Sequence, residues 1–164
     1  MEWVVVFGLL FMGVIVTLAT SGGTDTASTE VPTRGGSKLP RMAAINARML
    51  VADALVKVGT SSSAASRYAT KMVEDTWSAG LTLYPETFQK GNVSSHALAV
   101  ASLARAAEIA ASTGSVEVCS VFSRAIEAAM DVRWKFVSHE KPGDITVYKS
   151  AEITMKGLRS SPLP

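Results

Sequence analysis

The sequence predicts an all-α protein with an N-terminal single transmembrane helix, a flexible linker, an antiparallel four-helix bundle and a short C-terminal tail. The segment from Trp3 to Ala19 contains no charged residue. Four later segments repeat apolar residues at spacings of three and four, as amphipathic helices do. Hydrophobic residues make up 48% of the 164 residues and charged residues only 18%, which excludes a chain that is disordered throughout.

Residues 1–20 form the predicted membrane anchor. As a helix, the uncharged segment would be about 26 Å long, at the short end of the lengths that span a bilayer. Lipid offers the backbone no hydrogen bonds, so a segment this apolar is expected to be helical there. The side chains expected to face lipid are Trp3, Val4, Phe7, Leu10, Phe11, Ile15 and Leu18.

The alternative for this segment is a signal peptide that is cleaved near Ala19. Thr17 and Ala19 are small residues at suitable positions, but a signal peptide normally opens with basic residues and this chain opens with Met-Glu-Trp. If the segment is retained, the bases that follow it are Arg34, Lys38 and Arg41. By the positive-inside rule they place the C-terminal domain on the cytoplasmic side, or its organellar equivalent.

Residues 21–38 form the predicted linker. They consist almost wholly of Ser, Thr, Gly and charged residues, with Val31 as the one large apolar residue. Such a segment cannot bury enough apolar surface to offset its loss of conformational entropy on folding. We expect a flexible tether with a root-mean-square reach of about 25 Å.

Residues 39–138 form the predicted bundle. Its first helix is expected to begin at Pro40 and to end near Val58, ahead of Gly59. The side chains expected to be buried on this helix are Met42, Ile45, Met49, Ala52 and Val56. The second helix is expected to begin at the serines 61–63 and to end near Gly80. Its expected buried side chains are Tyr68, Ala69, Met72, Val73 and Trp77.

The third helix, from about Ser94 to Ser112, is rich in alanine and apolar almost all round, which predicts burial on several sides. The fourth is expected to run from Ser115 to about Val137. Its side chains at the spacing of a bundle seam are Val118, Phe122, Ala125, Ala129, Val132 and Phe136.

The connections between these helices predict how they are paired. Loops of a few residues join the first helix to the second and the third to the fourth, so each pair is expected to be antiparallel. The middle connection, residues 81–93, is longer. The side chains expected to cap one end of the core from this connection are Leu83, Tyr84, Pro85 and Phe88.

Residues 139–164 form a basic tail whose structure the sequence leaves open. The stretches 145–149 and 152–156 alternate and contain β-branched residues, which favours strands. Asp144 as an N-cap and Gly157 after the last turn would equally bracket a helix.

The sequence predicts no catalytic residue, no cofactor and no metal site. There is one cysteine, Cys119, and there are two histidines, His96 and His139, while the Glu-x-x-His pairs of carboxylate metal bundles are missing. We interpret His96 as a structural or surface histidine and Cys119 as a buried, inert thiol. The net charge is only +2, and the basic excess in the last fifth of the chain is less dense than the patch of a nucleic-acid-binding domain, so we expect no nucleic-acid partner. The sequon at Asn92 is relevant only if the domain lies outside the cytoplasm.

One surface is a candidate for docking. Trp134 lies on the polar side of the fourth helix, between Arg133 and Lys135. An exposed indole among bases is typical of a contact with another protein or with lipid headgroups. The alternative is that Trp134 packs against the C-terminal tail.

These observations together predict a non-catalytic, membrane-anchored accessory or assembly subunit of a larger membrane protein complex. Its expected partners are membrane lipid and other protein subunits. Two alternatives remain: a secreted or periplasmic helical binding module released by cleavage near Ala19, and an enzyme whose site is not recognisable in the sequence.

Overall fold

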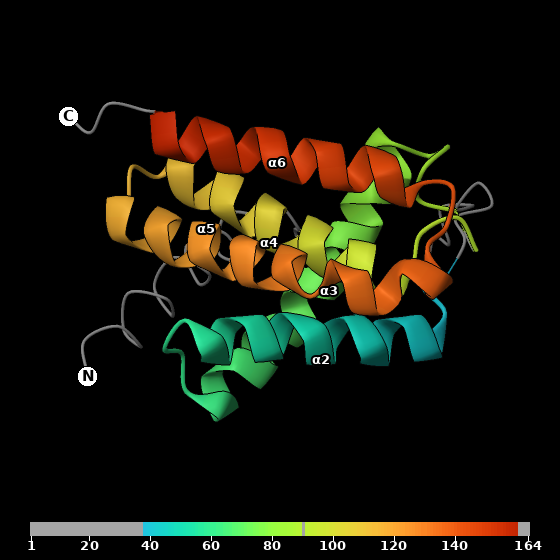
Figure 1. The fold of residues 1–164 in the computed structure, drawn as a ribbon, viewed down its shortest axis with the longest axis horizontal. Helices are drawn as coiled ribbons and strands as arrows, with labels where there is room; N and C mark the ends of the chain where they lie inside the picture. Colours follow the sequence, from blue (N-terminus) through green and yellow to red (C-terminus); the bar gives the residue numbers. More distant parts are fainter. Residues whose placement is uncertain (1–37, 90, 161–164) are drawn as a thin grey trace, which may run out of the picture. The chain divides into compact units, whose positions relative to one another are not determined.

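The computed structural model describes residues 38–89 and 91–160, which fall within one compact unit. In this part of the chain all regular structure is helical, and it contains no strand. The elements are α2 (Arg41–Lys57), α3 (Ser62–Leu83), α4 (Ser95–Ser112), α5 (Val116–Asp131), the 3₁₀ helix η1 (Arg133–His139) and α6 (Asp144–Ser160) (Figure 1). The prediction of an all-helical bundle is confirmed for these residues.

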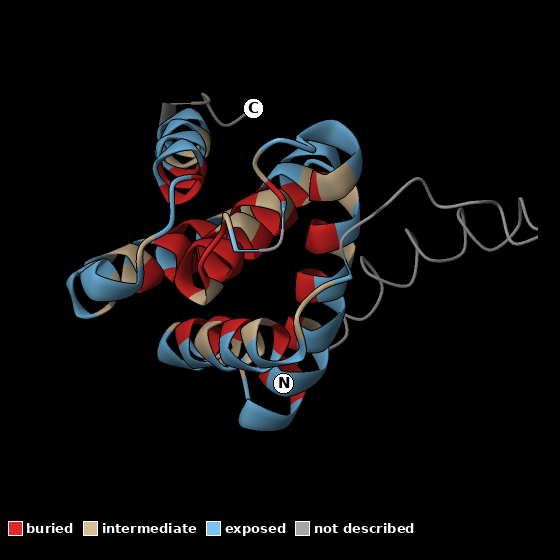
Figure 2. Ribbon diagram, turned by 90° about the vertical axis from the view of Figure 1, so that its right-hand side faces the viewer, coloured by how far each residue is buried: buried red, intermediate tan, exposed pale blue. Residues whose placement is uncertain are grey.

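Helix α4 is the centre of the bundle. It packs against α2, α3, α5 and α6, whereas α2 and α6 lie on opposite sides of it (Figure 1). Figure 2 shows the buried residues gathered on the inward faces of the helices. The expectation that this alanine-rich helix is buried on several sides is confirmed. Its buried residues are His96, Ala97, Leu98, Ala99, Val100, Ser102, Leu103, Ala104, Ala106, Ala107 and Ala110.

The chain reverses direction between α4, α5 and α6, which lie side by side, while α3 crosses the other helices steeply (Figures 1 and 2). Glycines with positive φ stand in the two tight connections, Gly59 after α2 and Gly114 after α4. These are conformations that only glycine adopts without strain. After the four predicted helices the structure has one more α-helix, α6, within the segment predicted as a tail.

Helix α2 buries the opposite face from the predicted one. Its buried residues are Ala44, Ala47, Val51, Ala54 and Leu55. The predicted buried side chains Met42, Ile45, Met49 and Val56 are exposed instead, and Ala52 is half-buried. That prediction was wrong because α2 has two apolar faces with the same three-and-four spacing. The face that is buried carries three alanines beside Val51 and Leu55, and α2 packs against the alanine-rich α4.

The buried faces of α3 and α5 agree with the sequence pattern. On α3, Ala69, Met72, Val73 and Trp77 are buried, and Tyr68 is half-buried. On α5, the predicted seam is buried from Val118 to Ala129, but the α-helix ends at Asp131 and the chain continues as η1 rather than as α-helix to Val137.

Phe88, in the connection after α3, covers part of the core. Phe88 is buried and packs edge-on against Trp77, with 6.0 Å between the ring centroids. A Cβ at Gly80 would overlap the Phe88 ring, so this glycine allows the ring to lie against the helix. The other residues expected to cap the core here, Leu83, Tyr84 and Pro85, are exposed.

The tail that the sequence left open is the helix α6. Helix α6 packs mainly on α4, and its buried residues include Asp144, Val147, Tyr148 and Ala151. The helical alternative is the one found, but Asp144 is the first residue of the helix rather than its N-cap, and Gly157 lies within the helix rather than after it.

Candidate functional site

A buried polar cluster joins the beginnings of α4 and α6. His96 lies in the first turn of α4, and its Nδ1 is 2.7 Å from the Tyr148 hydroxyl of α6. Its Nε2 is 2.8 Å from the carbonyl oxygen of Ala129 on α5. Because a carbonyl can only accept, Nε2 carries the proton, and Nδ1 accepts from the tyrosine hydroxyl. The imidazole also stacks on the Phe136 ring, with 4.6 Å between centroids.

Asp144 is a second buried connection between α4 and α6. Its carboxylate is fully buried and accepts two backbone hydrogen bonds, from Ser94 N–H at 2.8 Å and from Lys141 N–H at 2.9 Å. Ser94 is in turn the N-cap of α4, where its hydroxyl accepts from Ala97 N–H at 3.1 Å. The buried charge is therefore compensated by hydrogen bonds.

The electrostatics of the cluster keep its two central side chains neutral. Burial lowers the pKa of His96, and burial together with the Asp144 charge raises the pKa of Tyr148 to about 12. Arg133 lies over the Tyr148 ring, 4.1 Å from its centroid, and donates from Nε to Glu140 at 2.8 Å. Since both ring nitrogens of His96 are hydrogen-bonded, the cluster acts as a structural joint between α4, α5 and α6.

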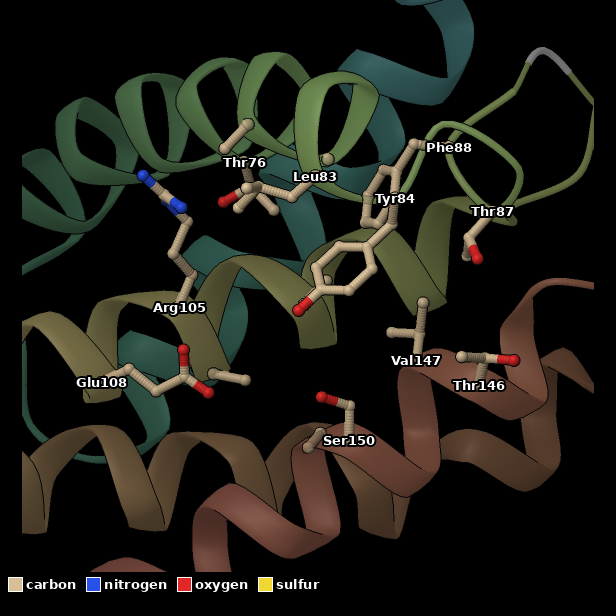
Figure 3. Close-up of a pocket in the computed structure, with 15 residues that line it drawn as sticks. Thr76, Leu83, Tyr84, Thr87, Phe88, Arg105, Glu108, Thr146, Val147 and Ser150 are labelled. Carbon is tan, nitrogen blue, oxygen red and sulfur yellow. The ribbon is translucent and has the colours of Figure 1, made fainter.

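A cavity of about 200 Å³ opens between α3, α4 and α6. Figure 3 shows Tyr84 reaching over it from the connection after α3, and Ser150 of α6 with its hydroxyl directed into it. Its lining is mainly apolar, with Arg105 and Glu108 of α4 at one side. Glu108 accepts a hydrogen bond from Thr154 at 2.7 Å, which ties α4 to α6. His96 does not line this cavity.

No group of three or more His, Cys, Asp or Glu side chains that could hold a metal ion lies within residues 38–89 and 91–160. Cys119 is half-buried rather than buried as predicted, and burial raises the pKa of its thiol. It is thus less ionised at neutral pH than an ordinary cysteine. His139 is exposed and lies beside the Ser138 hydroxyl, 3.0 Å away.

The structure separates the three residues of the predicted docking surface. The Trp134 side chain is 71% exposed, and the Lys135 Nζ lies 5.5 Å from the centroid of its ring. Arg133 instead turns inward to Tyr148 and Glu140. The residue that contacts the C-terminal helix is thus Arg133, and the exposed pair Trp134 and Lys135 is called the Trp134–Lys135 surface below.

The outer face of α2 is a second exposed surface, although the sequence pattern predicted that its residues are buried. We call Met42, Ile45, Met49, Ala52 and Val56 the α2 stripe. Met42 is 65% exposed and Met49 is 61% exposed. A sign of this surface was present in the sequence, because α2 carries two parallel apolar lines and a helix at the edge of a bundle can bury only one of them.

The predicted anchor residues lie outside the described residues: Trp3, Val4, Phe7, Leu10, Phe11, Ile15 and Leu18. The choice between anchor and cleaved signal peptide concerns the same segment. Among the helices that the structure does describe, none combines the length and apolar character needed to cross a bilayer.

Comparison with family models, with curated proteins and with solved structures finds no significant match.

Proposed function

We propose that this protein is a non-catalytic, membrane-anchored helical subunit that assists or assembles a larger membrane protein complex. Residues 1–20 hold it at the membrane, residues 21–38 link the anchor to the domain, and the helical domain binds another subunit on the cytoplasmic or equivalent side. The uncharged segment from Trp3 to Ala19 and the bases that follow it support this location.

The exposed indole of Trp134 is the observation that carries the binding role. Tryptophan offers a large apolar area at a small loss of side-chain entropy, which makes it one of the residues most often dominant in protein interfaces. Here it is 71% exposed on η1, and Lys135 adds a positive charge beside it. We therefore assign the Trp134–Lys135 surface to the contact with a partner subunit that presents an apolar pocket with an acidic rim.

A non-catalytic role is supported by the way the polar side chains are used. The hydrogen bonds of three buried side chains join helices, and none of these side chains lines the cavity: His96, Tyr148 and Asp144. A general base needs a free nitrogen or oxygen within reach of a substrate.

The location is tested by fractionation and by mass. We expect the chain to stay with the membrane after alkaline carbonate extraction and to show its full intact mass. Release by carbonate contradicts the anchor. Loss of the residues up to about Ala19 contradicts it as well and favours the secreted or periplasmic binding module.

The binding role is tested by purification in mild detergent from the protein's own membranes. We expect a companion subunit to copurify with the wild type and to be lost from Trp134→Ala. The matched control is Ile153→Ala, because Ile153 of α6 is also 71% exposed. A companion that is kept by both variants contradicts the assignment of the surface, and a chain purified without any companion contradicts the accessory role.

A further inference from the structure

The α2 stripe is an unpartnered apolar face with a regular spacing. Its residues follow one another at intervals of three, four, three and four, which is the spacing of positions a and d in a coiled-coil seam. Helix α2 packs against α3, α4 and α5, and the residues it buries there lie on other positions than the stripe. Four of its five side chains are exposed.

We propose that the α2 stripe binds a second copy of this chain, with the two α2 helices parallel and in register. A seam of this kind is self-complementary, because under a two-fold axis each a residue meets its own copy and each d residue does likewise. Met42, Met49 and Val56 occupy a positions, and Ile45 and Ala52 occupy d positions.

The charges beside the stripe agree with this occupant and this direction. The heptad that begins with Met49 at position a has Asp53 at position e. Arg48 is at position g of the heptad before it. In a parallel pair, a g residue faces the e residue five positions later in the other helix. Arg48 of each copy would therefore face Asp53 of the other, twice by symmetry. An antiparallel pair matches g with g and e with e, and does not bring these two charges together.

The Arg48 side chain is already held beside the stripe. Its Nη2 donates to Glu74 of α3 at 2.5 Å, and the pair is partly exposed. A guanidinium has five N–H donors in a planar arrangement, so the bond to Glu74 leaves others for a second carboxylate. Less side-chain entropy is lost on dimerisation than for an arginine that is free in solution.

The ends of the helices fit the same arrangement. A parallel pair places the two Pro40 residues at one end of the seam, so both preceding segments leave from the same side. This point rests on the proposed function, because two anchors must enter one membrane. Anchoring in a common membrane also raises the local concentration of the two copies, which strengthens a short interface. Since each α2 is already folded against α4, pairing does not have to nucleate a helix.

The test is disulfide cross-linking of the full chain in native-like lipid bilayers, in a Cys119→Ser background. We expect Met42→Cys to cross-link to its own copy and Val56→Cys to do the same, because these positions mark the two ends of the stripe. An exposed position on α6, Lys149→Cys, serves as the control and is expected to stay monomeric. Adding Met49→Glu to either reporter is expected to lower the cross-linked fraction at least about 10-fold, because it places two carboxylates face to face in the seam.

The outcomes separate the alternatives. Cross-linking only in a mixture of the two reporters would mean an antiparallel pair and overturn the proposal. Absence of cross-linking at both ends, with a monomeric mass in mild detergent, would overturn the second copy as occupant. Cross-linking at Met42 that survives Met49→Glu would mean that the pairing does not run along the stripe through Met49, and this would overturn the proposal too. A chain that self-pairs but is released by carbonate would contradict the membrane anchor alone, so the two proposals fail separately.

Discussion

The helices α2 and α4 are both apolar on more than one face, yet the bundle treats them differently. Helix α4 has α2, α3, α5 and α6 around it, and eleven of its residues are buried, down to the alanines. Helix α2 is at the edge, buries five residues, three of them alanines, and leaves large side chains such as Met42 and Met49 in solvent. Apolar composition thus shows how many faces a helix could bury, while its place in the bundle decides how many it does bury.

The largest effect is expected where α4 is covered on all sides. Leu103 is completely buried, so Leu103→Ala removes apolar contacts and leaves a cavity. We expect a loss of about 3 kcal/mol in the free energy of unfolding, measured by denaturant titration of the full chain in detergent. A loss below about 1 kcal/mol would mean that α4 is not packed as tightly as its burial indicates, and the contrast with α2 would disappear.

The second prediction concerns the beginning of α4, which is tied to α6 through Asp144. Asp144→Ala leaves the backbone N–H groups of Ser94 and Lys141 without their acceptor, and we expect a loss of about 2–3 kcal/mol. The control is Asp131→Ala, an exposed carboxylate at the end of α5, with an expected change within about 0.5 kcal/mol. Equal effects of the two substitutions would show that the buried carboxylate does not stabilise the contact between α4 and α6. The start of α2 has no such tie, since Pro40 provides no side-chain cap.

Much of this contrast could be predicted from the sequence. The near absence of polar residues around α4 predicted its burial, and the spacing on α3 and α5 predicted their buried faces, because each has one apolar face. On α2 two apolar faces have the same spacing, and the spacing alone predicted burial of the face with the larger side chains. The choice depends on the fit to α4, which is a tertiary property.

The polar cluster shows a similar limit. The position of His96 in the first turn of a helix could be predicted, but its partners, the Ala129 carbonyl and the Tyr148 hydroxyl, come from α5 and α6, far along the chain. No local pattern announces such contacts. In the Trp134–Lys135 surface, the direction of Arg133 depends on the Tyr148 ring, which is part of a segment whose helical structure the sequence left open.

A third prediction uses the pKa of His96 to show that α4 is buried at its beginning. Burial lowers this pKa below 6.5 in the folded state, so between that folded value and 6.5 the unfolded chain binds more protons. Stability from this residue is present above pH 6.5 and is lost as the pH falls below it. We expect the free energy of unfolding to decrease, by up to about 1.4 kcal/mol per pH unit, as the pH falls from 6.5 towards the pKa of His96 in the folded state.

Replacing the residue isolates its contribution. His96→Asn is expected to flatten the pH dependence in this range, whatever its effect on stability at pH 7, while His139→Asn, at an exposed site, is expected to leave the slope unchanged. If the His96→Asn protein kept the wild-type slope, the loss of stability would have to come from other groups, and the imidazole would not be held neutral by the bundle.

The smallest effect is expected on α2. Met49 is 61% exposed, so Met49→Ala removes few contacts within the domain, and we expect a change within about 0.5 kcal/mol when unfolding is measured at low protein concentration in excess detergent. If α2 pairs through its stripe, the same variant loses more stability at high concentration, because unfolding of a dimer is coupled to its dissociation. A loss above about 2 kcal/mol at low concentration would instead mean that Met49 packs within the domain. Helix α2 would then be packed on both of its apolar faces, as α4 is, and the two helices would no longer differ in burial.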